Sequence, residues 1–279
     1  MRENMRFPSF ETEAGQEGRF ETHNNVERGP HKNTELLISI TRHGEKTPEG
    51  KLTEKGFKQA EAKGQSREIV GNVVKGYHSP EFRTKQMVDA EIVAIPETIS
   101  GQELKKYDSR MRQQLDYNPL SKATMAEWKN QGGKAVEWYY QNYHDQAMDG
   151  DSISAGDMAN RTANLVYRHI RMAGRLKDGS RANLEYASHT PTLDMFVADA
   201  FKDQIEKDPM KPDGTNTIQK MGGGFKEAEE FQIRAKTDTT GMLSATFSFR
   251  GKEYQVDLEK LKTMSEAWLE KQKAFEKEE

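Results

Sequence analysis

Arg42 and His43 are the adjacent side chains in this sequence whose types suggest the most specific chemistry. A neutral imidazole can attack a phosphoryl group and carry it covalently, while a guanidinium binds the equatorial phosphoryl oxygens through charge-assisted hydrogen bonds. The pair follows the apolar run 36–40, which predicts a buried strand. It is therefore expected at the carboxyl end of a strand, where open α/β sheets build their active sites.

Two further segments place polar residues at predicted strand ends. The segment 79–86 begins with Ser-Pro, and we expect Pro80 just inside a helix and Arg83 in its first turn, beside free N–H groups that favour an anion. Residues 183–188 read as a strand that ends at His189, and Pro191 is expected to begin the next helix. A lone arginine or histidine is usually structural. The position of these two at strand ends favours a site.

Together these segments resemble the motifs of the histidine phosphatase superfamily, which includes phosphoglycerate mutases and related phosphatases. The resemblance covers about residues 35–200 and implies a three-layer α/β/α sandwich with a mostly parallel central sheet. The matching residues are Arg42-His43-Gly44, Leu52-Thr53 with Gly56 and Gln59-Ala60, Ser79-Pro80 with Arg83 and Gln86, His189, and more weakly Gly150-Asp151-Ser152 with Arg161.

The resemblance implies that His43 is the nucleophile and forms a phosphohistidine. It also implies that Arg42, Arg83 and His189 surround the phosphoryl group, with Gly44 in the same binding site. Two guanidinium groups suit this role because they can neutralise a transferring phosphoryl group whose charge is spread over three oxygens. Such a site requires no metal and no other cofactor.

The proton donor is where the sequence departs from the family. Relatives carry a glutamate at the position that aligns with Gln114, and an amide cannot protonate a leaving alkoxide. Asp116 is the nearest carboxylate and our first candidate for this role, ahead of Asp108, Glu45 and Glu127. The other interpretation is that the leaving group needs no acid, whereas an alkoxide gains about a hundredfold or more from one.

Composition narrows the class of protein. The chain of 279 residues has no cysteine, a net charge of −3 and seven histidines without metal-ligand spacing, so no metal site is predicted. No apolar run reaches the roughly 20 residues needed to cross a bilayer. The chain also has no overall positive charge that would attract nucleic acid. We expect a cytoplasmic hydrolase that binds neither membrane nor nucleic acid and acts on a phosphorylated small molecule or phosphoprotein. A homo-oligomer is left open.

Three regions are expected along the chain. Residues 1–33 read as a flexible tail, and residues 34–205 as the catalytic domain, with a helical cap at about 119–150. Residues 206–279 read as an appendage of a loop, a β-hairpin and a charged helix. Whether the loop at 206–224 closes over the site or only connects is left open.

The predicted function is that of a phosphatase that works through a phosphohistidine on His43. The alternatives are a phosphoryl mutase and a phosphate-binding pseudoenzyme or scaffold that has lost its acid at Gln114. The short loop between Gly44 and Leu52 lacks the asparagine common in mutases, which argues against a sugar-phosphate mutase. The residues after His189 are Thr190-Pro191, so the aspartate that donates the proton in the acid phosphatase branch is absent here as well.

Overall fold

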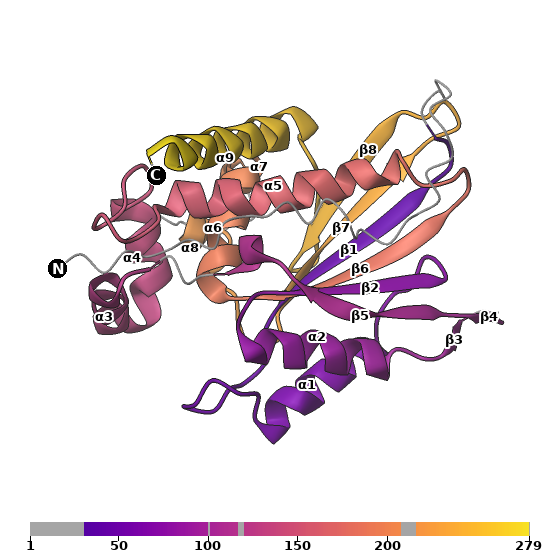
Figure 1. Ribbon diagram of the computed structural model, residues 1–279, viewed down its shortest axis with the longest axis horizontal. Coiled ribbons are helices and arrows are strands. Elements are labelled where there is room, and N and C mark those ends of the chain that lie inside the picture. The colour runs from indigo at the N-terminus through magenta and orange to yellow at the C-terminus, as the bar shows by residue number, and fades with distance from the viewer. Residues whose placement is uncertain (1–30, 100, 117–119, 208–215, 279) are drawn as a thin grey trace.

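A seven-stranded mixed sheet forms the centre of the computed structural model, which describes residues 31–99, 101–116, 120–207 and 216–278 (Figure 1). A separate pair is formed by β3 (Thr98–Ile99) and β4 (Gln102–Glu103). In spatial order, the strands of the large sheet are β5 (Lys105–Met111), β2 (Val73–His78), β6 (Arg181–Ser188), β1 (Glu35–Arg42), β7 (Glu230–Thr237), β8 (Leu243–Phe249) and β9 (Lys252–Gln255).

The sheet is parallel from β5 to β1 and antiparallel from β1 to β9. Strand β1 is buried along almost its whole length, as expected of a parallel strand that helices cover on both faces. The predicted α/β fold with a central sheet between helical layers is confirmed. The predicted hairpin is also confirmed, and its strand β7 pairs with β1, so that the C-terminal strands extend the main sheet.

Helices cover both faces of the sheet, with α1 and α2 on one side and α5, α6 and α9 on the other (Figure 1). The short helices α3 and α4 lie beyond the end of the sheet toward which β1 and β6 run. The helices are α1 (Glu54–Gln65), α2 (Phe82–Ala94), η1 (Gln113–Leu115), α3 (Lys122–Gln131), η2 (Gly132–Lys134), α4 (Ala135–Asn142), α5 (Ala155–Ala173), α6 (Thr190–Ala200), α7 (Lys202–Glu206), α8 (Thr217–Lys220) and α9 (Leu258–Glu278).

One local expectation needs correction. Pro80 does not open a helix, because α2 begins at Phe82 and Glu81 is its N-cap residue. In the stretch predicted as a helical cap, α3 and α4 are separate helices, since Gly132 adopts a positive φ of 55° that ends the first of them. The predicted tail at 1–33 lies mostly outside the described residues, as do residues 208–215 of the predicted loop.

The division into three regions stays a prediction. Within the described ranges, no helix is both long enough and apolar enough to cross a membrane.

Candidate active site

Three adjacent parallel strands end at the same edge of the sheet and bring the predicted site residues together. In the register of the sheet, Arg42 on β1 lies opposite Ser188 on β6, and His78 on β2 lies opposite Ala187. The N–H of His43 donates to the carbonyl oxygen of Ser188 at 3.1 Å. The residues that follow these strands therefore meet at one carboxyl edge, the expected place for a site in such a sheet.

Several motif residues build the loop after β1, and the role of Gly44 in substrate binding stays a prediction. A Cβ on Gly44 would lie 2.7 Å from Oε1 of Gln59, and one on Gly56 would lie 2.3 Å from the carbonyl oxygen of Glu45. Only glycine permits these approaches between the loop and α1. The Gln59 side chain then accepts a hydrogen bond from the N–H of Glu45 at 2.9 Å. The side chain of His43 is thus anchored on a tightly packed turn.

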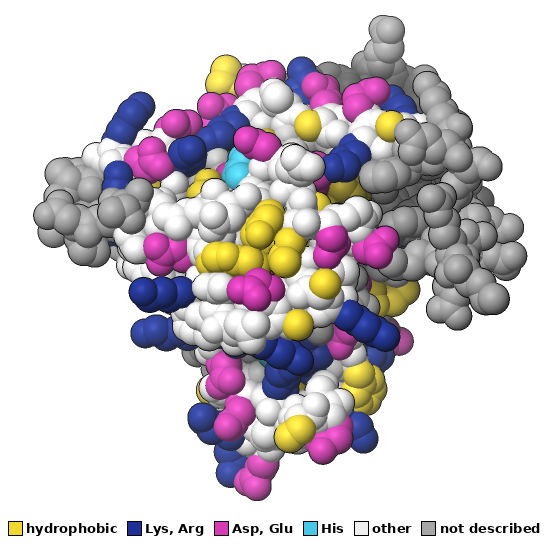
Figure 2. Space-filling view, turned by 90° about the vertical axis from the view of Figure 1, so that its left-hand side faces the viewer, with side chains coloured by type: hydrophobic (Ala, Val, Ile, Leu, Met, Phe, Trp, Pro, Cys, Tyr) yellow, Lys and Arg dark blue, Asp and Glu magenta, His cyan; other side chains and the backbone are white. Residues whose placement is uncertain are grey.

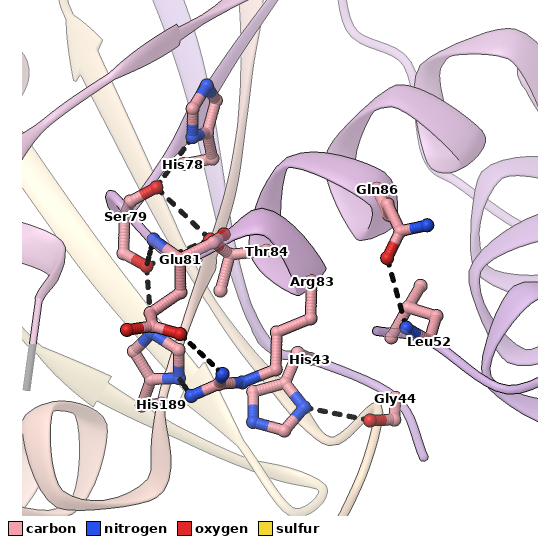
Figure 3. A network of polar contacts seen from close by, with 10 residues as sticks. All are labelled: His43, Gly44, Leu52, His78, Ser79, Glu81, Arg83, Thr84, Gln86 and His189. Atoms are coloured by element: carbon pink, nitrogen blue, oxygen red, sulfur yellow. Dashed lines mark hydrogen bonds and ion pairs between the residues drawn. The ribbon is translucent and has the colours of Figure 1, made fainter. Parts of the chain in front are cut away.

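The entry to α1 is fixed in the same way. Thr53 is the N-cap residue, and its hydroxyl accepts from the N–H of Gly56 at 3.0 Å. Gln86, on α2, accepts from the N–H of Leu52 at 3.0 Å through its side-chain oxygen (Figure 3). Thr53 and Gln86 thus have a structural role in the motifs, because they hold the loop 44–53 against α1 and α2.

His43 is buried, with 5% of its surface exposed, and its Nδ1 lies 2.8 Å from the carbonyl oxygen of Gly44. A carbonyl oxygen can only accept, so Nδ1 carries the proton and the lone pair of Nε2 is available for attack. Burial lowers the pKa of His43 to about 3, and the positive charges of Arg83 and Arg42 act in the same direction. The imidazole is therefore neutral at physiological pH, as a nucleophile must be.

His189 lies edge-on to His43, with 5.2 Å between the ring centroids. Its Nδ1 is 3.3 Å from Nη2 of Arg83, which can only donate, so the proton of His189 is on Nε2. Nε2 in turn donates to the hydroxyl of Ser79 at 2.7 Å, and Ser79 is 2.8 Å from the hydroxyl of Thr84 (Figure 3). Burial and the nearby cations lower the pKa of His189 well below its ordinary value. The contacts orient a second neutral imidazole toward the site.

Arg42 is held from the opposite side, by the segment that precedes β7. Its Nη1 donates to the carbonyl oxygen of Phe225 at 2.5 Å, and the N–H of Phe225 donates to the buried carboxylate of Asp194 at 2.8 Å. Arg250 donates to the carbonyl oxygens of Met221, Gly223 and Gly224 and so stabilises the same segment. Burial lowers the pKa of Arg42, while Asp194 raises it. The position of Arg42 thus depends on the C-terminal part of the chain.

Two charged residues at the site were not among the sequence candidates. Lys46 is close enough to His43 and His189 for its charge to lower the pKa of both imidazoles. Glu81 accepts a hydrogen bond from Nη1 of Arg83 at 2.6 Å. Both lie within three residues of a recognised motif residue. That spacing is the signal in the sequence that could have identified them.

Asp116 is fixed by its main chain on the helical side of the site. Its carbonyl oxygen accepts from Nη2 of Arg161 and from the hydroxyl of Thr192 at 3.1 Å. The charge of Asp116 also acts on the buried Arg161, whose pKa burial lowers to about 10. These contacts tie η1, which contains Gln114, to α5 and α6. The role of Asp116 as proton donor stays a prediction.

The assembled site has a clear electrostatic character. Arg42, Lys46 and Arg83 place three positive charges around two neutral imidazoles. Arg83 is buried and Arg42 half-buried, and although Glu81 pairs with Arg83, positive charge remains in excess. Such an excess is costly without an anion, so the site suits a phosphoryl group. On the surface of the face where α3 and α4 lie, cationic and anionic side chains are interspersed (Figure 2). Among the residues that the structure describes, no cluster of three or more His, Asp or Glu could hold a metal ion.

No family model matches the chain, and no curated protein matches it either. Several solved structures are similar to it. One is a mycobacterial hydrolase with 16% identity and a TM-score of 0.49, and the match covers 79% of this chain and 100% of that one. A mycobacterial glucosyl-3-phosphoglycerate phosphatase has 16% identity and a TM-score of 0.43, with 73% and 91% covered.

A phosphoglycerate mutase from Bacillus anthracis strain Sterne has 12% identity and a TM-score of 0.48, with 84% of this chain and 98% of that chain covered. The solved structures to which this chain is similar thus include a phosphatase and a phosphoglycerate mutase.

Proposed function

We propose that the protein is a phosphatase of the histidine phosphatase superfamily, which hydrolyses a phosphorylated substrate through a covalent phosphohistidine on His43. The observation that carries this proposal is the state of His43. It is a buried, neutral imidazole whose Nδ1 proton is tied to Gly44, and it lies among the cations that the phosphoryl group needs. A histidine with a purely structural role does not require an excess of positive charge around it.

The proposed reaction has two steps. In the first, Nε2 of His43 attacks phosphorus, the N–P bond forms, and the P–O bond to the leaving group breaks. Arg42 and Arg83 stabilise the charge on the equatorial oxygens, and His189 positions the guanidinium of Arg83 by accepting its hydrogen bond. In the second step a water oxygen attacks phosphorus, the N–P bond breaks, and phosphate leaves with His43 restored.

The substrate class is a phosphate ester on a small molecule or on a protein. A phosphoryl mutase would share the first step and differ only in the acceptor, since a substrate hydroxyl would replace water. A bisphosphate activator separates the two, because it stimulates a mutase by phosphorylating His43 in advance. A phosphatase does not need it.

The test is hydrolysis of two model compounds, an aryl phosphate with a good leaving group and an alkyl phosphate with a poor one. Wild type should turn over the aryl phosphate, and His43→Ala should lower kcat by roughly a thousandfold or more, because the nucleophile is lost. The matched control is His144→Ala. His144 lies in a separate cluster, where Asp199 is its main partner and raises its pKa to about 9.

Mass spectrometry of the enzyme quenched during turnover should find one phosphoryl group on His43. Binding of inorganic phosphate without any His43-dependent turnover would instead support the pseudoenzyme. Turnover that persists in His43→Ala would contradict the covalent mechanism.

A further inference from the structure

Glu81 is a carboxylate in direct contact with the phosphoryl-binding arginine. One of its oxygens lies 2.6 Å from Nη1 of Arg83, and the same guanidinium contacts His189 through Nη2. The side chain of Glu81 is 27% exposed, so it can exchange a proton with water. A carboxyl group at this position lies beside the arginine that binds the phosphoryl group and can be reprotonated from solvent.

The main chain of Glu81 is fixed by the network that orients His189. Its N–H donates to the hydroxyl of Ser79 at 3.2 Å, and its carbonyl oxygen accepts from the hydroxyl of Thr84 at 2.6 Å. Glu81 is the N-cap residue of α2, yet its side chain makes no capping hydrogen bond. The carboxylate points instead toward Arg83. Its placement therefore does not serve the helix.

The relative positions of the groups suit an in-line reaction. In Figure 3 the guanidinium of Arg83 lies between the imidazole of His43 and the carboxylate of Glu81. A phosphoryl group bound to Arg83 and attacked by His43 has its leaving oxygen on the side away from the imidazole. Glu81 therefore lies on the side of Arg83 away from the nucleophile, which is the side where a proton donor to the leaving oxygen is needed.

We propose that Glu81 is the general acid of this enzyme, an assignment that rests on the phosphatase function proposed above. As the P–O bond breaks, the carboxyl proton of Glu81 passes to the leaving oxygen, which departs as an alcohol. In the second step the carboxylate takes a proton from the water that attacks phosphorus. Glu81 is thereby protonated again, and both protons are accounted for.

The test is the leaving-group dependence of Glu81→Gln, a substitution that keeps the size of the side chain and removes the acid. Turnover of the alkyl phosphate should fall by about a hundredfold, and that of the aryl phosphate by only several-fold, because a good leaving group needs little protonation. Glu81→Asp, which keeps a carboxyl group, should restore part of the alkyl activity.

The matched control is Glu49→Gln, an exposed glutamate in the loop between β1 and α1. It should leave the ratio of alkyl to aryl turnover at the wild-type value. The proposal is overturned if Glu81→Gln lowers both activities equally, or if it only tightens the binding of inorganic phosphate. The second result would mean that Glu81 merely competes for Arg83.

These outcomes are distinct from failure of the phosphatase function, which would appear in wild type as the absence of His43-dependent turnover of either compound. In that case the assignment of Glu81 is overturned as well.

Discussion

Two charged clusters lie on the same sheet and have opposite imbalances. At the carboxyl edge, Arg42, Lys46 and Arg83 surround neutral histidines, so positive charge is in excess. Beside α1 and α2, the buried Arg67 contacts three carboxylates, of which Glu230 also pairs with Lys63 at 3.3 Å. The first imbalance can be relieved by an anion that enters from solvent. In the second, Glu91 and Glu185 have no contact with solvent, so their negative charge can be relieved only by protons.

The contacts of Arg67 define the second cluster. Its Nε lies 3.0 Å from Glu185 on β6, its Nη2 lies 3.5 Å from Glu91 on α2, and its Nη1 bonds Glu230 on β7. Glu91 and Glu185 have no exposed surface. Burial raises the pKa of Glu91 to about 8 and that of Glu185 to about 7, although Arg67 opposes the shift. The difference between the clusters suggests that one serves binding and the other serves the joining of helices to sheet.

The largest effect should come from Arg67→Met. The carboxyl groups of Glu91 and Glu185 would remain fully buried without their counter-charge, so we expect the free energy of unfolding to fall by about 3–5 kcal/mol. Urea denaturation measures this loss. The control is Arg234→Met, which removes a half-exposed arginine paired with Glu35 and Glu68 and should cost about 1 kcal/mol or less. Equal losses in the two variants would contradict the distinction between enclosed and exposed pairs.

Arg83→Met should show the reverse pattern. We expect kcat/KM for the aryl phosphate to fall by about a hundredfold to a thousandfold, as when one preorganised donor to a transition state is removed. The free energy of unfolding should stay the same or rise, because one of several clustered positive charges is lost. Lys85→Met, an exposed change on the same helix, is the control. A loss of stability without loss of activity would assign Arg83 to the scaffold.

The smallest effect concerns the pH dependence of stability. In the folded protein Glu91 keeps its proton up to a pKa of about 8, whereas in the unfolded chain it ionises near its ordinary value of 4.5. Between these values the folded state binds more protons, so the contribution of Glu91 to stability falls as pH rises. Glu91→Gln should remove this contribution and make the decline between pH 5 and pH 8 shallower.

Urea denaturation at several pH values measures that slope, with Glu61→Gln on the exposed side of α1 as the control. If the curves of wild type and Glu91→Gln ran parallel, Glu91 would be ionised in the folded state. The buried cluster would then be balanced in another way.

The parts of the site that depend on short sequence patterns could be predicted from the sequence alone. Strand ends, the N-cap at Thr53 and the position of Arg83 in a first turn follow from patterns of a few residues. Register in the parallel sheet then brings these strand ends to one edge. For this reason His43, Arg83 and His189 could be predicted as neighbours.

The remainder depended on long-range packing. Lys46 and Glu81 lie close in sequence to motif residues, but their importance follows from the approach of loop 44–53 to α2. The hydrogen bond from Arg42 to the carbonyl oxygen of Phe225 joins residues far apart in the chain. The buried Arg67 cluster likewise unites α2, β6 and β7, and a charged residue read in isolation is expected on the surface.

The pairing of β1 with β7 has a consequence for how the protein is made. Residue Glu35 lies opposite Arg181 on one side and Lys236 on the other, so neither neighbour of β1 is close in the chain. During synthesis the nucleophile-bearing strand emerges early and must wait for both partners, and contacts between such distant segments form slowly. We therefore expect the nascent chain to depend on chaperones until β7 has left the ribosome, and the site to be assembled only after that point.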